Sequence, residues 1–512
     1  MPFAPLPLGQ RIPSSPHAVS CSLPTMRDVR GYEEKNPETM SQLTSGYPRF
    51  VVHPFARQLA VHMLAKHKIL AGRTLWLVTS PKMAQALVTH LGGLAAQADT
   101  FALDGVNGAS HPANTELFAR AKTFLQNIGG FMSSREAEDH LIRLGQPMGP
   151  DAAAVPTAPH AETVFPGDAV GEIRRVLRRA LPECGDGDLH LAPSGMNAIY
   201  AAFRASADLQ ASRGRTVWLQ LGWMYLDTIA ILKKFTAAPA DYVYIRDPLD
   251  FAGIERIFEK HGPRIAGVFA ELPTNPLIQT PDVAALAALC RKHSAHLLLD
   301  PSVSSIFDLD ILRHADVVTS SLTKYTASEG DLTAGLAAIN PAAPDAAELR
   351  RRIAAAIEPV YPRDLARLAA QIGETETVLT QIHANTAKVA AFLASHPKIA
   401  DVFWALHPDS RENYLKIARS PDATGGMITF TLKQSSAMEP FYDRLRLPKG
   451  PSFGMKTTLI CPFMYLAHYD LVTTPAGLAE LAASRLDPDL LRLCCGTEPA
   501  EEIIAALAEA LG

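Results

Sequence analysis

The sequence of 512 residues is poor in cysteine, carries no large excess of either charge and has no long apolar run. Its six cysteines include no CxxC motif, which excludes a disulfide framework and a cysteine-based zinc site. With 48 Lys and Arg against 52 Asp and Glu, the net charge of −4 argues against a nucleic-acid partner. Apolar stretches such as residues 283–290 are far shorter than the roughly 18 to 20 residues that a membrane span needs. We therefore predict a cytoplasmic protein that contacts neither nucleic acid nor a membrane.

Hydrophobic residues make up 47% of the chain, which is enough for a large core and for two main domains. Residues 1 to about 48 are rich in proline and have little apolar periodicity, so we predict an extended arm. An amphipathic helix is expected from residue 53 to about 70, and a strand from residue 73. Proline, glycine and alanine without periodicity predict a loop over 144–166.

After residue 185 the hydrophobic pattern becomes regular. Apolar strands alternate with helical segments as far as residue 341, which predicts an α/β fold with a mostly parallel, buried sheet and flanking helices. Helices dominate beyond that point, and a final strand at 490–495 precedes one more helix. The predicted divisions are an arm (1–55), a large domain (56–355) with an extra segment (about 70–185), and a smaller α+β domain (356–512).

Polar residues at the ends of apolar strands are the first candidates for a site, because open α/β sheets bind ligands at the carboxyl ends of their strands. Asp300 ends the strand HLLLD, and Lys324 follows the strand DVVTS beside two hydroxyl residues. A helix that starts at 194–196 offers free backbone N–H groups, which suit a phosphate. Singly, these features also fit a solvent-facing lysine, a capping aspartate and an ordinary helix start. Together they fit pyridoxal phosphate, which needs an amine for its aldehyde, a carboxylate for its ring nitrogen and donors for its phosphate.

Seven motifs occur in the order that one enzyme family shows. They are YPR (47–49), SGM (194–196), ELPTNPL (271–277), Asp300, SLTKY (321–325), GGMITF (425–430) and LLRLCCGTE (490–498). On these motifs the chain resembles the Cys/Met metabolism γ-family of fold-type I pyridoxal phosphate enzymes. Within that family, the segments GYPRFVVHP, FMSSREAEDHL, GWMYLDT and PFMYLAHY are similar to the fungal-type cystathionine γ-synthases. The resemblance covers nearly the whole chain and implies the pyridoxal phosphate-dependent transferase fold of type I.

The resemblance implies a role for each matching residue. Lys324 is expected to bind the cofactor aldehyde, and Asp300 to pair with the pyridinium nitrogen. Arg492 is expected to bind the α-carboxylate of the substrate, and Asn275 to lie beside the cofactor and that carboxylate. The residues expected to hold the phosphate are Gly195, Met196, Ser321 and Thr323, together with Tyr47 and Arg49 from the neighbouring subunit.

Departures from the family pattern bear on the cofactor and on the substrate. Many members have a tyrosine that stacks on the cofactor at the position of Leu221, and we expect Trp223, or else Tyr225, to stack in its place. Many members also have Glu-Ser where this chain has Thr457 and Thr458, which leaves the substrate open. We place Thr458 among the substrate-binding residues. The segment after the lysine, TASEGDLTAG, is a looser match than in most members.

The activity that the resemblance implies is a γ-replacement, in which cysteine displaces the acyl group of an O-acylhomoserine to give cystathionine for transsulfuration and methionine biosynthesis. Two sister activities, O-acylhomoserine sulfhydrylase and cystathionine or methionine γ-lyase, need the same motifs and stay open. A cofactor-binding scaffold without turnover is a more distant alternative. Because Tyr47 and Arg49 are expected to act in a neighbouring subunit, we expect a homo-oligomer, with a dimer of dimers favoured. No metal is expected, since His53, His62 and His67 lack the i,i+4 spacing of a helical metal site.

Overall fold

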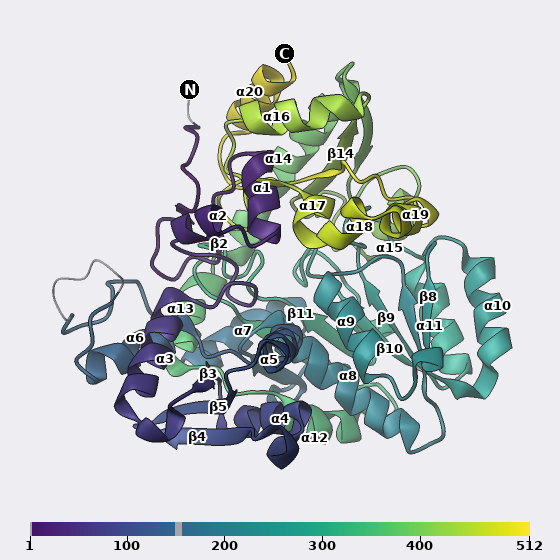
Figure 1. Ribbon diagram of the computed structural model, residues 1–512. Coiled ribbons are helices and arrows are strands. Elements are labelled where there is room, and N and C mark those ends of the chain that lie inside the picture. Colours follow the sequence, from purple (N-terminus) through teal and green to yellow (C-terminus); the bar gives the residue numbers. More distant parts are fainter. Residues whose placement is uncertain (1–2, 149–155) are drawn as a thin grey trace.

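The computed structural model describes residues 3–148 and 156–512, and the largest of its sheets has seven strands (Figure 1). In spatial order the strands are β6 (Leu189–Ala192), β12 (Gly335–Ile339), β11 (Val317–Ser320), β10 (His296–Asp300), β9 (Ile265–Glu271), β7 (Val217–Leu221) and β8 (Tyr242–Ile245). Neighbouring strands from β11 to β8 are parallel, whereas β12 runs antiparallel to both of its neighbours. This sheet confirms the predicted, mostly parallel α/β architecture.

Helices cover both faces of the large sheet, and each face has its own apolar core. One core includes α7 (Ala169–Ala180), α10 (Phe251–His261), α11 (Val283–Lys292) and α13 (Pro362–Ile372). The other includes α8 (Gly195–Ala211), α9 (Leu226–Phe235) and α12 (Ala346–Ala356). Aspartate caps explain where three helices begin, because Asp168, Asp250 and Asp282 each accept a backbone N–H in the first turn. Within the described ranges, no helix has both the length and the apolar character that a bilayer crossing requires.

A smaller antiparallel sheet belongs to the C-terminal part of the chain. Its strands, in spatial order, are β13 (Ile399–Phe403), β14 (Met427–Leu432), β16 (Leu491–Cys494) and β15 (Leu459–Pro462). The helices of this part are α14 (Thr375–Ser395), α15 (Arg411–Ile417), α16 (Met438–Arg444), α17 (Phe463–Ala467), α18 (Tyr469–Thr473), α19 (Pro475–Ala483) and α20 (Ala500–Leu511). Arg492 lies within β16, where it pairs with Thr429 on one side and Cys461 on the other. Two neighbouring strands therefore hold its backbone in place.

The first 48 residues are more structured than the extended arm that their proline content predicts. They contain the strands β1 (Arg11–Ile12) and β2 (Ser20–Cys21) and the helices α1 (Met26–Glu33) and α2 (Pro37–Gln42). Thr25 and Asp28 form a capping box that starts α1. Met26 and Val29, both fully buried, pack into the core of the C-terminal sheet, and α1 lies beside α17 (Figure 1). A helix of eight residues is too short for its apolar face to appear as periodicity.

The extra segment forms a small antiparallel sheet, and three of its helices lie around this sheet together with the helix that precedes the segment. The strands, in spatial order, are β3 (Arg73–Leu77), β5 (Val106–Pro112) and β4 (Asp99–Leu103), and the helices are α3 (Pro54–Lys66), α4 (Pro81–Leu91), α5 (Thr115–Ile128) and α6 (Ser134–Arg143). The predicted helix after residue 53 and the predicted strand at 73 are both confirmed. In the predicted loop, residues 144–148 and 156–166 contain neither helix nor strand, and 149–155 lie outside the described residues.

Candidate active site

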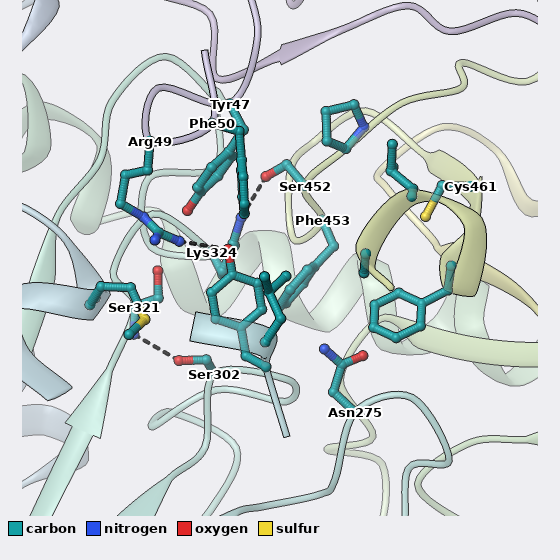
Figure 2. A pocket seen from close by; sticks show the side chains of 18 of the residues that line it. Tyr47, Arg49, Phe50, Asn275, Ser302, Ser321, Lys324, Ser452, Phe453 and Cys461 are labelled. Atoms are coloured by element: carbon teal, nitrogen blue, oxygen red, sulfur yellow. Dashed lines mark hydrogen bonds between the residues drawn. The ribbon is translucent and has the colours of Figure 1, made fainter. Parts of the chain in front are cut away.

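A pocket of about 350 Å³ opens at the carboxyl ends of the parallel strands. Residues that follow β7, β9, β10 and β11 line one wall, and the N-terminal segment, α5, β15 and β16 contribute to the others. Figure 2 shows this pocket, with the side chains of Lys324 and Ser452 pointing toward each other. The pocket therefore lies at the edge of the sheet where the order of the strands predicts a ligand.

Asp300 ends β10 and is only 3% exposed. Its Oδ1 accepts hydrogen bonds from the backbone N–H of Ser302 at 2.9 Å and from the Ser302 hydroxyl at 2.5 Å. The same hydroxyl oxygen accepts the backbone N–H of Ser321 at 2.7 Å, which ties the end of β10 to the end of β11 (Figure 2). Burial raises the pKa of Asp300 to about 6, although the hydrogen bonds from Ser302 act in the opposite direction. A protonated pyridine nitrogen is the kind of cation that would stabilise the charged form of this carboxyl group.

Lys324 follows β11 and is 7% exposed. Its Nζ donates a hydrogen bond to Ser452 Oγ at 2.5 Å and lies 4.6 Å from the centre of the Tyr47 ring. Burial lowers the pKa of Lys324 well below its ordinary value, and the positive charges of Arg492 and Arg49 lower it further. The neutral amine favoured by these surroundings is the form that adds to an aldehyde and that accepts a proton.

The start of α8 forms a cradle for an anion. Ser194 caps this helix, because its hydroxyl oxygen accepts the backbone N–H of Asn197 at 3.2 Å. A Cβ added to Gly195 would lie 2.7 Å from the Cβ of Ser321, so only glycine lets these two segments approach so closely. Gly195 and Met196 line the pocket at the positive end of the helix dipole, across from Ser321. The cradle fits the phosphate group of pyridoxal phosphate.

Tyr47 and Arg49 line the pocket of their own chain. Arg49 is 5% exposed; its Nη1 donates to Asp227 Oδ2 at 2.5 Å, and its Nη2 donates to the Tyr225 hydroxyl at 2.6 Å. The family resemblance implies that both residues reach the site of a neighbouring subunit. In the structure they lie at the site of the same chain. Helix α1 packs on the C-terminal sheet, and a backbone oxygen of α5 accepts a hydrogen bond from Arg49.

Arg492 and Asn275 lie on the side of the pocket that faces the C-terminal sheet. The guanidinium carbon of Arg492 is 5.2 Å from the centre of the Phe453 ring and 4.7 Å from that of Phe463. Its Nη2 donates to the backbone oxygen of Ser452 at 3.2 Å. Asn275 is 2% exposed, and its Oδ1 has no hydrogen-bond partner among the described residues. A guanidinium held between two rings can present its remaining N–H groups to a carboxylate.

The aromatic residue that lines the pocket after β7 is Tyr225 and not Trp223. Trp223 packs in a neighbouring apolar cluster, and its indole N–H donates to His468 Nε2 at 3.1 Å. Leu221, at the position of the stacking tyrosine of the family, is the last residue of β7 and is buried in the core of the sheet. Gly222, with a φ of 70°, turns the chain so that Tyr225 reaches the pocket.

Thr323 and Thr458 do not line this pocket among the described residues. The Thr323 hydroxyl donates to the backbone oxygen of Ala334 at 3.3 Å and accepts the Ala334 N–H at 3.0 Å. The Thr458 hydroxyl donates to Glu498 Oε2 at 2.7 Å and accepts the N–H of Gly496 at 2.8 Å. Each threonine side chain therefore fastens a loop beside the site, where it can act on the site only through that loop.

Glu271, Ser302 and Ser452 are pocket residues that the sequence patterns do not single out. Glu271 ends β9 within the motif ELPTNPL, so its place at a strand end is a signal that could have found it. Its Oε1 accepts the N–H of Tyr225 at 2.7 Å, and its Oε2 has no partner among the described residues. Burial and the neighbouring charge of Asp300 raise the pKa of Glu271 well above its ordinary value. Ser302 follows Asp300 in a turn, and Ser452 lies in a loop, so no periodic pattern marks either.

Comparisons with known proteins agree with this site. A family model described as "Cys/Met metabolism PLP-dependent enzyme" matches residues 173–512. The chain is 35% identical over 501 residues to the L-2-amino-4-chloropent-4-enoate dechlorinase/desaturase of Streptantibioticus cattleyicolor, a match that covers 98% of this chain and 97% of that protein. It is 27% identical over 616 residues to the cystathionine gamma-synthase of Neurospora crassa, with 99% and 98% covered.

Solved structures with the same fold include the cystathionine gamma synthase of Xanthomonas oryzae pv. oryzae in complex with aminoacrylate and cysteine. That likeness has a TM-score of 0.56 at 20% identity and covers 73% of this chain and 97% of the other. The cystathionine gamma-lyase of Lactobacillus plantarum complexed with L-serine also has a TM-score of 0.56, at 19% identity, with 73% and 98% covered. The two structures support the predicted fold of type I, and the matches in sequence decide the family. This chain belongs to the Cys/Met metabolism family of pyridoxal phosphate-dependent enzymes.

Proposed function

We propose that this chain uses pyridoxal phosphate to remove a leaving group from the γ-carbon of an α-amino acid. When bound, the cofactor supplies an electron sink that acidifies the protons on the carbons near the amino group. The observation that carries the proposal is the buried Nζ of Lys324, whose pKa is lowered and which shares a pocket with Arg492. A neutral amine can accept a proton from Cα and then one from Cβ, and loss of a γ-substituent needs both.

Different residues around Lys324 act on the substrate and on the cofactor ring. Arg492 and Asn275 bind the carboxylate of the substrate, which turns its Cα–H toward Nζ of Lys324. Ser452 orients that amine through the hydrogen bond at 2.5 Å. Asp300 would favour a protonated ring nitrogen when the cofactor is bound, because a buried carboxylate is stabilised by a cationic partner.

The phosphate is bound by the backbone and side chains at the start of α8, by β11 and by the N-terminal segment. The residues with this role are Gly195, Met196, Ser321, Tyr47 and Arg49. Tyr225 is the aromatic residue that would pack against the cofactor ring, whereas Trp223 stabilises the neighbouring apolar cluster. Thr323 and Thr458 keep the loops of the phosphate and substrate sites in place through their hydrogen bonds.

Two candidate reactions share the steps up to the loss of the leaving group and differ in the steps that follow. In the first, cysteine adds to the γ-carbon of an O-acylhomoserine and cystathionine forms; the likeness to the Neurospora crassa synthase supports it. In the second, no thiol adds and an unsaturated product leaves the site. The relative that is 35% identical and is named a dechlorinase/desaturase supports this elimination.

Mass spectrometry of the products distinguishes the candidates. The purified holoenzyme is incubated with O-acetyl- or O-succinylhomoserine, with and without cysteine or sulfide. Cystathionine alone and L-2-amino-4-chloropent-4-enoate are tested separately. Cystathionine that appears only with cysteine identifies the synthase, and release of chloride identifies the elimination. Homocysteine formed with sulfide, or 2-oxobutyrate formed from cystathionine, would instead identify a sulfhydrylase or a γ-lyase. Lys324→Ala is the control, and turnover by that variant, or no product from any substrate, would contradict the proposal.

The assembly and the location of the protein belong to the same proposal. We expect a homo-oligomer in the cytoplasm, with a dimer of dimers as the assembly that the family resemblance implies. Sedimentation velocity of the purified holoenzyme measures the number of subunits, and fractionation of the source cells measures the location. A holoenzyme that sediments as a single chain would contradict the expected assembly.

A further inference from the structure

The two residues proposed to bind the substrate carboxylate come from different parts of the fold. Asn275 lies in the loop after β9 (residues 272–280), next to the large sheet, whereas Arg492 lies in β16 of the C-terminal sheet. A carboxylate can bind both residues only if the spacing between amide and guanidinium is fixed, because a shift of about 1 Å weakens such contacts. Contacts between this loop and the C-terminal sheet therefore matter for substrate binding.

Thr429 lies beside Arg492 in the C-terminal sheet. The two residues are directly opposite each other on the antiparallel strands β14 and β16, so their side chains share one face of the sheet. Cys461 pairs with Arg492 on its other side, and Phe403 pairs with Thr429, which extends the row across all four strands. Cys461 and Leu277, a residue of the loop after β9, belong to one apolar cluster, and Phe403 packs against it. The face that carries Thr429 and Arg492 is therefore the face turned toward this loop.

The hydroxyl group of Thr429 joins this face to the loop. Thr429 is fully buried, and its Oγ1 donates a hydrogen bond to the backbone oxygen of Pro276 at 2.8 Å. Pro276 directly follows Asn275, which is also buried and whose Oδ1 has no hydrogen-bond partner among the described residues. The backbone beside Asn275 is thus held by a bond that starts from the neighbour of Arg492.

Other hydrogen bonds give the loop its shape or hold its far end. The N–H of Thr274 donates to the backbone oxygen of Gln279 at 2.9 Å, and its hydroxyl oxygen accepts the N–H of Gln279 at 3.0 Å. Its backbone oxygen accepts the N–H of Ile278 at 3.0 Å. Asn413, in α15, donates from Nδ2 to the backbone oxygen of Thr280 at 3.2 Å, five residues after Asn275. These bonds close the loop on itself and fix its end, but they do not hold Asn275 against the strand of Arg492.

We infer that Thr429 is a positioning residue for the substrate carboxylate, because its hydroxyl group sets the place of Asn275 relative to Arg492. Thr429 is next to Arg492 across the strands and next to Asn275 through the backbone oxygen of Pro276. Without the hydroxyl, that buried oxygen loses its donor and the loop is free to shift toward another one. The inference rests on the proposed binding of the carboxylate by Arg492 and Asn275, and it is independent of the leaving group.

Binding of norvaline to the holoenzyme tests the inference without turnover. Norvaline has the α-amino and α-carboxylate groups of a substrate but no leaving group, and the visible absorbance of the bound cofactor follows its binding. Thr429→Val keeps the branched shape of the side chain and removes the hydroxyl, so we expect the affinity for norvaline to fall about tenfold. Thr429→Ser keeps the hydroxyl and should bind norvaline within about threefold of the wild type. Cofactor affinity should be unchanged in both variants, and any loss of kcat/KM in Thr429→Val should arise mostly through KM.

Thr431→Val is the matched control. Thr431 lies two residues further along β14, on the same face of the sheet, and is also buried. Among the described residues its hydroxyl makes no hydrogen bond to the loop after β9, so this variant should bind norvaline as the wild type does. Thermal unfolding of the variants shows whether each fold is intact. An equal loss of norvaline affinity in both valine variants, or a loss that Thr429→Ser does not restore, would overturn the inference.

Arg492→Lys, measured in the same titration, separates the inference from the proposed function. If Arg492→Lys loses affinity for norvaline while Thr429→Val binds it as the wild type does, the inference is wrong and the proposed carboxylate site stands. If Arg492→Lys also binds norvaline normally, or if the wild-type holoenzyme does not bind it, the proposed carboxylate site is wrong and the inference fails with it.

Discussion

Asp300 and Glu271 lie directly opposite each other on the parallel strands β10 and β9, and both carboxyl groups are buried. Burial raises the pKa of both, and the charge of Asp300 raises that of Glu271 further. Two neighbouring buried carboxyl groups do not both ionise easily, because each negative charge disfavours the other. Burial therefore favours the neutral form of Glu271, while Asp300, with a pKa of about 6, is the carboxyl group that carries a charge more readily.

Stability of the apo-protein is expected to depend on pH through Asp300. Its pKa is raised from 3.8 to about 6 on folding, so the folded state binds this proton more tightly than the unfolded chain does. Below about pH 4 the carboxyl group is neutral and does not destabilise the fold. As the pH rises through 6 the buried group ionises, and this ionisation lowers the free energy of unfolding. Apo Asp300→Asn should thus be more stable than the apo wild type at neutral pH, by on the order of 1 to 3 kcal/mol, with no difference at about pH 4.

Chemical unfolding of the two apo-proteins across this pH range measures the difference. Asp422→Asn, at an exposed position, is the matched control and should show no such dependence on pH. The same Asp300→Asn substitution should weaken cofactor binding in the holoenzyme, because asparagine cannot balance the charge of a protonated ring nitrogen. A constant difference in stability from pH 4 to pH 8 would contradict the assigned pKa of Asp300.

Arg492→Lys is expected to affect the substrate and not the cofactor. Lysine keeps the positive charge but loses the flat fork that lies between Phe453 and Phe463 and that binds a carboxylate through two parallel hydrogen bonds. We expect kcat/KM to fall roughly 100-fold, mostly through KM, while the absorbance of the bound cofactor is unchanged. Steady-state kinetics and an absorbance titration of the cofactor check the two statements. A loss of bound cofactor with an unchanged KM would contradict the assignment of Arg492 to the substrate.

Tyr225→Phe and Trp223→Phe form a matched pair, since each removes one polar hydrogen-bonding group from an aromatic residue. Tyr225→Phe removes the acceptor of the 2.6 Å bond from Arg49, so cofactor affinity should fall several-fold. Trp223→Phe removes the donor to His468 in the neighbouring cluster, so it should lower the free energy of unfolding by about 1 to 3 kcal/mol and leave cofactor affinity unchanged. Cofactor titrations and thermal unfolding measure the two effects. A loss of cofactor affinity in Trp223→Phe but not in Tyr225→Phe would indicate that Trp223 contacts the cofactor.

Ser452 offers a test of how Lys324 is oriented. Its φ of 81° is a conformation that residues with a Cβ seldom adopt, yet its hydroxyl accepts the hydrogen bond from Lys324. Ser452→Gly removes the hydroxyl and relieves the backbone, whereas Ser452→Ala removes the hydroxyl alone. Turnover should fall about tenfold in both, and the glycine variant should be the more stable of the two by roughly 1 kcal/mol. Kinetics and unfolding of the pair check this, and full turnover in either variant would show that Ser452 does not orient the amine.

Residues that follow a buried parallel strand are predictable from the sequence, because the topology alone brings the strand ends together. Asp300 and Lys324 lie in one pocket for this reason, and the start of α8 lines the same pocket. Glu271 obeys the same rule, since it is the last residue of β9 and lines the same pocket. The helices that follow aspartate caps are likewise predictable from local chemistry.

Side chains that depend on a turn or on packing between distant segments are not predictable in this way. Trp223 and Tyr225 are two residues apart, and only the turn at Gly222 decides which of them enters the pocket. Thr458 directly precedes β15 in the sequence, but its hydroxyl donates its hydrogen bond to Glu498. The place of Arg49 depends on α5, more than 70 residues along the chain, and no periodicity reports such a contact.

Exchange of hydrogen for deuterium at the substrate, followed by NMR, tests the central claim most directly. Loss of a γ-substituent requires Lys324 to take protons from both Cα and Cβ, so the wild-type holoenzyme in D₂O should label both positions of a slow or unreactive substrate analogue such as norvaline. Lys324→Ala should label neither position. Labelling at Cα alone by the wild type would contradict γ-chemistry and would fit a racemase, an activity named for a relative from Aspergillus violaceofuscus that is 27% identical over 585 residues.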